Sequence, residues 1–325
     1  MKNIAARICS ILFCAALLPA AAGGAEAERS FPVRPIRMVV PFPPGAASDF
    51  LARVVGQKLG EIYGQQVIVD DRPGGGGVVG SVIVAKAAPD GYTLSMIGTP
   101  HVVNALLAEK PLYRPIEDFT AITQVASLPN ILIVGIPVNS VQELIALAKQ
   151  KPGQLNFGSV GIGSLSYMEG ELFKAAAGID AVNVSFKMLG DAVTEMMAGR
   201  VHFYVIPVAA GMPLLKDGRL RALAVTIDKR LASLPNVPTM AEAGLPNYRF
   251  DGWFGVAGPA KMPRNLVTSL NKDIVGILQQ TDTRDRFVRQ GAEPVFGTPE
   301  EFRKLMQTEL VRFQKVIKDS GLKAQ

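Results

Sequence analysis

The sequence predicts an α/β protein with doubly wound sheets in two domains. Short apolar runs alternate with longer amphipathic segments, which is the pattern of parallel strands connected by helices. A unit of strand, glycine-rich loop and helix occurs near residues 36–63 and again near residues 154–177, and we expect one unit in each domain. The chain has 325 residues, of which 48% are hydrophobic and 19% charged. That length suits roughly two domains of about 150 residues each.

The first expected helix has a clear pattern. Leu51, Val55 and Leu59 recur at helical spacing, and Ser48 or Asp49 would cap the start of the helix. The strands around it are short apolar runs bounded by Gly and Pro. In chain order we expect strand 36–41, helix 48–63, strand 66–70, helix 78–87, and strands 92–97, 121–125 and 131–136.

Two long helices are expected to close the chain, and one apolar face of the last helix predicts core packing. No long linker rich in Pro, Gly or Ser separates the two halves, so the chain should cross between domains at short strands. The later elements are expected to be helix 141–151, strand 154–158, helix 164–177, strands 181–186, 202–206, 221–226 and 253–257, and helices 264–280 and 299–320.

Residues 1–27 have the pattern of a secretory signal peptide. Lys2 and Arg7 give a basic start, and the apolar run at 8–18 is too short to span a bilayer. Small residues follow and end in an A-x-A cleavage pattern. We expect cleavage after Ala27, with Ala22 as the alternative, and export of the mature chain.

Scarce residue types exclude several kinds of chemistry. Cys9 and Cys14 both lie in the signal segment, so the mature chain has no thiol nucleophile. With two His in the whole chain, a multi-ligand zinc site or a His-based catalytic cluster lacks its residues, and we expect no metal and no cofactor. The net charge of +6 comes without a basic stripe interleaved with aromatics. We therefore expect no nucleic-acid partner, whereas attraction of small anions is compatible with this charge.

Two loops combine small residues with the start of a helix. The loop 41–49 carries prolines that rigidify its entry, and from Gly45 onward its residues are small. The loop 157–164 contains three glycines and the hydroxyls of Ser159 and Ser164. Free N–H groups at a helix N-terminus bind anions, so two such loops facing each other would clamp a carboxylate. The alternative is that both are tight strand-to-helix turns without a ligand.

A literal G-x-G-x-x-G motif at Gly75, Gly77 and Gly80 does not predict dinucleotide binding, because residues 71–73 intervene after the strand and no ribose-binding acid ends the next strand. His202 at a strand start is expected to be structural. His101 follows a strand end, where ligands bind in such folds, and either lines a cleft or is structural.

A set of sequence motifs extends along the chain. These are PIRMVVPFPPG at 35–45, DRPG at 71–74, PDGYTL at 89–94, DF at 118–119, GSVGIGS at 158–164, LPNVPT at 234–239 and EAG at 242–244, with Asp49, Arg230 and Trp253. Together they resemble a known family, the Bug-type, TctC-like solute receptors of tripartite tricarboxylate transporters. The resemblance covers essentially the whole mature chain.

The resemblance implies a periplasmic-binding-protein (Venus flytrap) clamshell in which both loops bind one carboxylate through backbone N–H groups and ordered water. It implies domain 1 at 28–129 and 251–325, and domain 2 at 130–250. The expected ligand-binding residues are Phe42, Gly45, Ala47, Ser48 and Asp49 in the first loop, Ser159, Gly161, Gly163 and Ser164 in the second, and His101 and Tyr167 beside them.

Several positions depart from the family pattern. Ala46 stands where a second Gly is usual, Tyr167 where a His is common, and VSFKM at 184–188 replaces a usual Val-Pro-Tyr-Lys-Gly. Glu195 takes the place of an Asp, and methionines stand at Met188, Met196 and Met197. These changes suggest a larger or more apolar carboxylate. The alternative is that the methionines are core residues.

The expected function is a periplasmic receptor, a monomer, that closes around a small organic acid and delivers it to its cognate membrane permease, without catalysis. One alternative is a receptor that presents its closed form to a membrane signalling partner. Another is a secreted serine hydrolase, for which only a Ser–Lys arrangement survives, with no motif.

Overall fold

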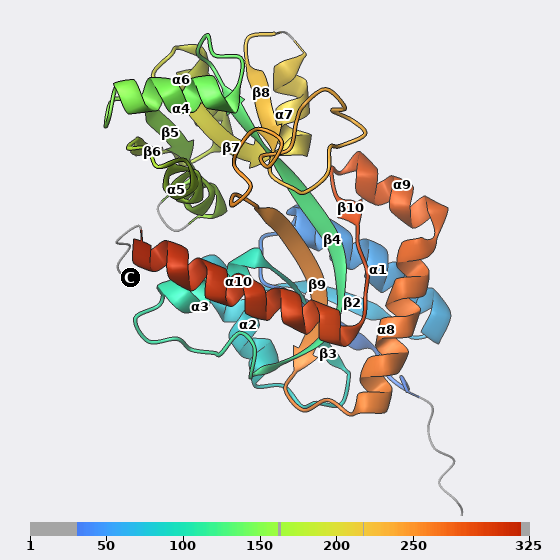
Figure 1. Cartoon of the computed structure of the whole chain (residues 1–325). Coiled ribbons are helices and arrows are strands. Elements are labelled where there is room, and N and C mark those ends of the chain that lie inside the picture. The colour runs from blue at the N-terminus through green and yellow to red at the C-terminus, as the bar shows by residue number, and fades with distance from the viewer. Residues whose placement is uncertain (1–30, 162–163, 217, 320–325) are drawn as a thin grey trace, which may run out of the picture.

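The computed structural model describes residues 31–161, 164–216 and 218–319. These residues form two lobes joined by two long strands (Figure 1). The predicted signal segment 1–27 lies outside the described residues. Within the described residues, no helix is both long enough and apolar enough to cross a membrane.

The lower lobe in Figure 1 is a sheet covered by helices on both faces. Its strand order is β2-β1-β3-β9-β4. Helices α1 and α8 pack on one face, while α2, α3 and α10 pack on the other. The elements are β1 (Ile36–Val40), α1 (Ala47–Tyr63), β2 (Val67–Asp71), the 3-10 turn η1 (Gly75–Gly77), α2 (Val78–Ala85), β3 (Thr93–Gly98), α3 (Thr99–Leu107), β4 (Phe119–Val134), β9 (Asp251–Pro259), α8 (Arg264–Gln279) and α10 (Pro299–Asp319).

The upper lobe continues the sheet beyond β4 in the order β4-β7-β5-β6, with β8 also paired to β4. Helices α4 and α5 cover one face, and α6 and α7 cover the other. The elements are α4 (Val141–Gln150), β5 (Asn156–Ser159), α5 (Leu165–Ala177), β6 (Val182–Ser185), α6 (Leu189–Met197), β7 (Phe203–Pro207), α7 (Val208–Leu215) and β8 (Arg221–Val225). The short α9 (Thr281–Arg289) and β10 (Glu293–Pro294) lead from α8 back to α10.

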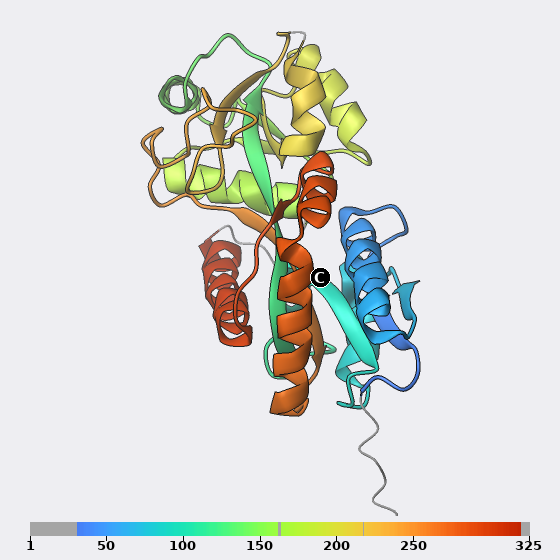
Figure 2. The same cartoon turned by 90° about the vertical axis from the view of Figure 1, so that its right-hand side faces the viewer.

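Strand β4 belongs to both lobes. Its first part pairs with β9 as far as Pro129 opposite Asp251, and from Asn130 opposite Pro207 it pairs with β7. Figure 2, the turned view, shows the same strand running through both lobes. The lobes are therefore connected by continuous hydrogen-bonded sheet.

The α/β class, the two-domain clamshell and the repeated strand–loop–helix unit agree with the sequence analysis. The first three strands, β1, β2 and β3, are parallel as predicted, whereas β9 runs antiparallel to both β3 and β4. The two strands expected at 121–125 and 131–136 are one strand, and this crossing strand of 16 residues is not short. The alternation of apolar runs with helical segments does not indicate the direction in which a later strand enters the sheet.

Helices α3, α6, α7 and α9 were missed. Helix α7 contains Gly211 and Pro213, which are typical of loops, and α3 starts directly after β3 without a turn signal. The expected cap of α1 was also wrong. The N-cap is Ala46, and Ser48 and Asp49 lie inside the first turn. The cap expected for α5 is correct, since Ser164 Oγ accepts a hydrogen bond from the N–H of Tyr167 at 3.2 Å.

Candidate functional site: a cavity between the two lobes

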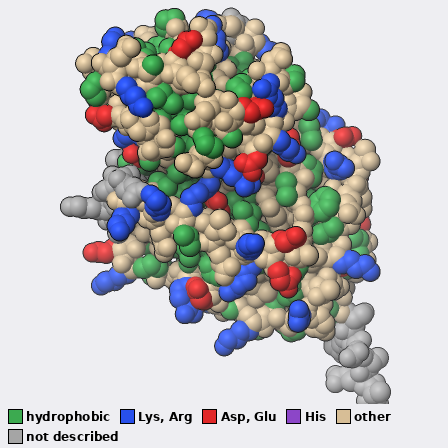
Figure 3. Space-filling view, viewed as in Figure 1, with side chains coloured by type: hydrophobic (Ala, Val, Ile, Leu, Met, Phe, Trp, Pro, Cys, Tyr) green, Lys and Arg blue, Asp and Glu red, His purple; other side chains and the backbone are tan. Residues whose placement is uncertain are grey.

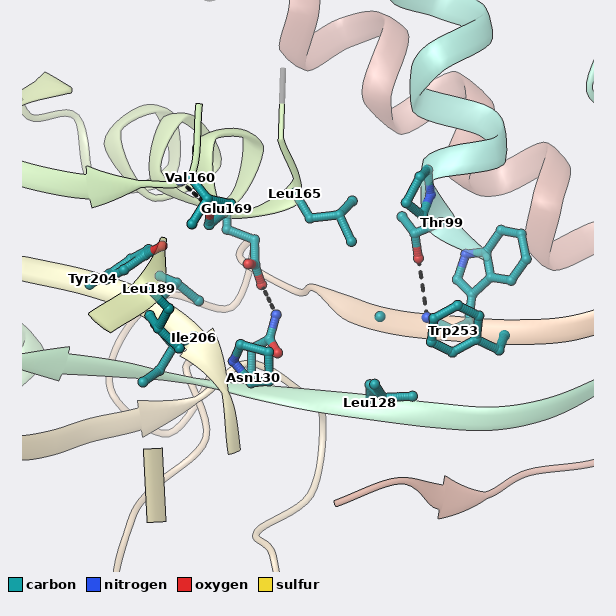
Figure 4. Close-up of a pocket in the computed structure, with 16 residues that line it drawn as sticks. Thr99, Leu128, Asn130, Val160, Leu165, Glu169, Leu189, Tyr204, Ile206 and Trp253 are labelled. Carbon is teal, nitrogen blue, oxygen red and sulfur yellow. Dashed lines mark hydrogen bonds between the residues drawn. The ribbon is translucent and has the colours of Figure 1, made fainter. Parts of the chain in front are cut away.

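A cavity of about 410 Å³ lies between the lobes. The lower lobe contributes the start of α3 and part of β9, and the upper lobe contributes the start of α5, α6 and β7 (Figure 4). The lining residues are Thr99, Pro100, Leu128, Asn130, Val160, Leu165, Ser166, Glu169, Leu189, Tyr204, Val205, Ile206, Pro207, Gly252, Trp253 and Phe254. Most of these side chains are apolar, so the body of a ligand would lie against hydrocarbon and aromatic surface.

One hydrogen-bonded polar pair, which contains a single ionisable group, interrupts this apolar wall. Glu169 on α5 is only 1% exposed, and its Oε1 accepts a hydrogen bond from Nδ2 of Asn130 on β4. Burial raises the pKa of Glu169 to about 8, although the bond from Asn130 and the charge of Arg312 oppose the shift. The carboxyl group of Glu169 is therefore mostly protonated at pH 7.

The second predicted loop borders this cavity, but its hydroxyls already have hydrogen-bond partners in the loop or on β6. Ser164 Oγ donates to the carbonyl of Gly161 at 2.6 Å and caps α5, while Ser166 Oγ accepts from the N–H of Val160 at 3.1 Å. Ser159 is fully buried and contacts Asn183 and Ser185. Gly163 lies outside the described residues.

The free donors of this loop lie slightly further along the chain. Leu165 and Ser166 are the first two residues of α5, and the N–H groups at these positions have no intrahelical partner. Both residues line the cavity. The start of α5 can therefore present two N–H groups and the positive end of its dipole to an anion.

The first predicted loop lies next to the cavity without lining it. Phe42 packs edge-on against Phe254, a lining residue, with ring centroids 6.2 Å apart. The N–H of Gly45 donates to Oδ2 of Asp49 at 2.8 Å, and Oδ1 of Asp49 lies 2.6 Å from Nε of Arg53. The N–H of Gly45 is therefore already bonded to a carboxylate of the chain itself.

The start of α1 nevertheless retains backbone donors. Ala47, Ser48 and Asp49 are its first three residues, and the methyl side chain of the N-cap Ala46 cannot accept hydrogen bonds from their N–H groups. The buried hydroxyl of Ser48 has no hydrogen-bond partner within the described part of the chain.

His101 and Tyr167 pack into the lobes. The imidazole of His101 is 4% exposed, stacks on Tyr113 at 4.9 Å, and reaches Ser81 Oγ and the carbonyl of Pro115 through its two nitrogens. Burial lowers the pKa of His101 to about 4, so the ring is neutral at pH 7. Tyr167 is 9% exposed and belongs to the upper core. Both side chains are structural in this arrangement, and neither lines the cavity.

The apolar character of the cavity does not come from the three methionines singled out in the sequence. Met196 is fully buried in the upper core, whereas Met188 and Met197 are 66% and 45% exposed. The apolar walls come instead from residues that no loop motif marked, among them Leu128, Leu189 and Ile206.

Sequence reasoning also missed the polar pair. Glu169 lies on the buried face of α5, one turn after the glycine-rich loop, and a charged residue on such a face is the signal that could have found it. No local sequence pattern predicts that Asn130 lines the cavity, because its position depends on where β4 changes its pairing partner from β9 to β7.

A family model described as the tripartite tricarboxylate transporter family receptor matches residues 51–322. The protein BugT of Bordetella pertussis is 35% identical over 298 residues, which is 90% of this chain and 91% of BugT. The structure of R. palustris Rpa4515 with adipate is 37% identical, covers 90% of this chain and 98% of its own, and has a TM-score of 0.75.

The structure of MatC (Rpa3494) from Rhodopseudomonas palustris with bound malate is 30% identical. It covers 88% of this chain and 100% of its own, with a TM-score of 0.71. The structure of the periplasmic binding protein BugD is 27% identical, covers 91% of this chain and 100% of its own, and has a TM-score of 0.73. The chain belongs to the tripartite tricarboxylate transporter receptor family.

Proposed function

We propose that this chain is a periplasmic receptor that captures a small organic carboxylate between its lobes and delivers it to a membrane permease of the tripartite tricarboxylate type, without catalysis. The observation that carries the proposal is the apolar cavity beside the first turn of α5, where the N–H groups of Leu165 and Ser166 have no intrahelical partner. Such a site holds an anion without a basic side chain.

The proposed anchor is strong enough for a receptor. A hydrogen bond to a charged group contributes roughly 1.5–3 kcal/mol, and a micromolar complex requires about 8 kcal/mol in total. Three or four N–H groups and burial of an apolar ligand body would supply this free energy.

Closure of the lobes would bring the first loop into the site. We propose that the N–H groups of Ala47, Ser48 and Asp49 then join those at the start of α5, with Phe42 as an apolar wall behind Phe254. Domain boundaries at 129/130 and 250/251 fit the change of strand partners along β4. A signal peptide at 1–27 would export the receptor, which we expect to act as a monomer.

A thermal-shift screen of residues 28–325 tests the proposal. The protein is first unfolded and refolded to remove bound ligand, and is then screened against mono-, di- and tricarboxylates, aromatic acids, amino acids and their amides. A ligand at about 100 times its Kd adds about 2.7 kcal/mol and should raise the unfolding midpoint by several degrees. A shift with an acid and none with its amide supports capture of a carboxylate. If no acid shifts the midpoint, the proposal fails.

Ala47→Pro tests the role of the first loop. Proline is favoured at the first helical position, and the preceding Ala46 has the extended ψ of 159° that proline requires. The variant removes one backbone N–H and should lower the affinity for the carboxylate by about tenfold or more. Ala47→Ser keeps the N–H and serves as the control. Equal affinity of both variants would remove Ala47 from the proposed anchor.

A further inference from the structure

Glu169 brings a carboxyl group into an otherwise apolar cavity. Of the residues found to line the cavity in the described part of the chain, it is the only one with a carboxyl or a basic side chain. Figure 4 shows its side chain reaching from α5 toward Asn130, which donates to Oε1. Any ligand that fills this part of the cavity must lie close to the carboxyl group.

The surroundings of Glu169 favour its neutral form. Arg312 on α10 attracts the ionised form, but its Nη2 already lies 2.6 Å from Oε2 of Glu309. The Tyr248 hydroxyl bonds the backbone carbonyl of Glu169 at 3.4 Å and not its carboxyl group, and Tyr204 on β7 is a neutral neighbour at pH 7. Burial outweighs these contacts, which is consistent with the raised pKa of Glu169.

We propose that Glu169 and Asn130 form a subsite that accepts a second ligand carboxylate only together with a proton, so that the receptor favours acids whose far end is uncharged. This inference rests on the proposed function, since it concerns the end of the ligand away from the anchored carboxylate. Two carboxylates in contact in an apolar cavity cannot both be ionised, so one proton must be held between them.

A neutral far end needs no such proton. An amide oxygen accepts from protonated Glu169, and an amide N–H donates to the ionised form, so a monoamide suits both states. A dicarboxylate binds the protonated receptor and, above the pKa of Glu169, must take up one proton on binding. The ratio of dicarboxylate to monoamide affinity therefore reports on this subsite.

The test compares adipate with its monoamide, and then the homologous diacid–monoamide pairs from four to eight carbons, by calorimetry at pH 6 and pH 9. In the wild-type protein we expect the Kd of the diacid to rise about tenfold between these pH values, while that of the monoamide changes less than about twofold. In Glu169→Gln the Kd values of the diacid and of the monoamide should both be the same at pH 6 and pH 9, because glutamine still accepts a hydrogen bond from Asn130 and does not titrate. Glu171→Gln removes a carboxylate from α5 that pairs with Lys174 outside the cavity, and should retain the wild-type profile.

Proton uptake provides a second measurement on the wild-type protein alone. Calorimetry at pH 9 in two buffers of different ionisation enthalpy should show close to one proton taken up per diacid and close to none per monoamide. This subsite would be contradicted by a diacid Kd that is equal at pH 6 and pH 9 in the wild type. It would also be contradicted if Glu169→Gln still lost diacid affinity at pH 9. Either result would leave the proposed capture of a carboxylate intact. If no acid of any series binds the refolded protein, the proposed function fails and this inference fails with it.

Discussion

Asn130 donates a hydrogen bond from Nδ2 to Oε1 of Glu169, and this bond ties the point where β4 changes lobes to the helix that borders the cavity. Asn130 is the first residue of β4 that pairs with β7, directly after Pro129 ends the pairing with β9. The polar group of the cavity is thus attached to the connection between the lobes. A ligand that changes the protonation or position of Glu169 therefore also acts on the connection between the lobes.

The buried carboxyl of Glu169 should cost stability as the pH rises. Its pKa is raised from 4.5 to about 8 in the folded protein, so its favourable contribution is present below about pH 4.5 and is lost progressively up to about pH 8. We expect the stability of Glu169→Gln relative to the wild type to increase by about 4 kcal/mol between pH 5 and pH 8.5. Urea unfolding at both pH values measures this difference. An equal difference at both would show that Glu169 does not titrate in this range.

Trp253 should report ligand binding directly. It is the single tryptophan of the chain, is 1% exposed and lines the cavity. A carboxylate in the cavity changes the surroundings of the indole, so we expect a saturable change in emission with the same Kd as calorimetry gives. Trp253→Phe should abolish the signal. A ligand that binds by calorimetry without changing the emission would lie elsewhere.

Much of the fold could be predicted because its signals are local. The strand and helix pattern of the unit at 36–63, the N-cap Ser164 and the apolar face of α10 depend on neighbours in sequence. The direction of β9 and the continuity of β4 could not be predicted, because they depend on pairing between residues more than 100 positions apart.

The candidate site, like the fold, has a part that local sequence patterns predict and a part that depends on tertiary contacts. The sequence indicated the glycine-rich loop before α5, but the loop uses its own hydroxyls internally and leaves Leu165 and Ser166 at the cavity. The apolar wall and the Asn130–Glu169 pair come from strands and helices that meet only in the folded chain. A pattern within one segment therefore found the edge of the site and not its interior.

Two serines at the starts of α1 and α5 should differ in their contribution to stability. Ser164 Oγ accepts from the N–H of Tyr167 and donates to Gly161, so Ser164→Ala removes a helix cap and should cost about 1 kcal/mol. Ser48 is buried, but its Oγ has no partner among the described residues, so Ser48→Ala should be neutral or slightly stabilising. Chemical denaturation of both variants compares them. A cost for Ser48→Ala equal to that of Ser164→Ala would mean that the hydroxyl of Ser48 has a partner in solution.

Two helical glycines should respond in opposite ways to alanine. A Cβ at Gly170 on α5 would lie 2.2 Å from the Phe157 ring, which is fully buried, so Gly170→Ala forces the core of the upper lobe to move and should cost about 1–3 kcal/mol. A Cβ at Gly276 on α8 meets nothing within 4 Å, so Gly276→Ala should stabilise the protein by about 0.5–1 kcal/mol through its higher helix propensity. Thermal and urea unfolding of both variants measure the sign of the change in the free energy of unfolding for each one. Stabilisation by Gly170→Ala would show that Phe157 can withdraw from α5 at little cost, and that the packing of this helix beside the cavity is looser than the contacts indicate.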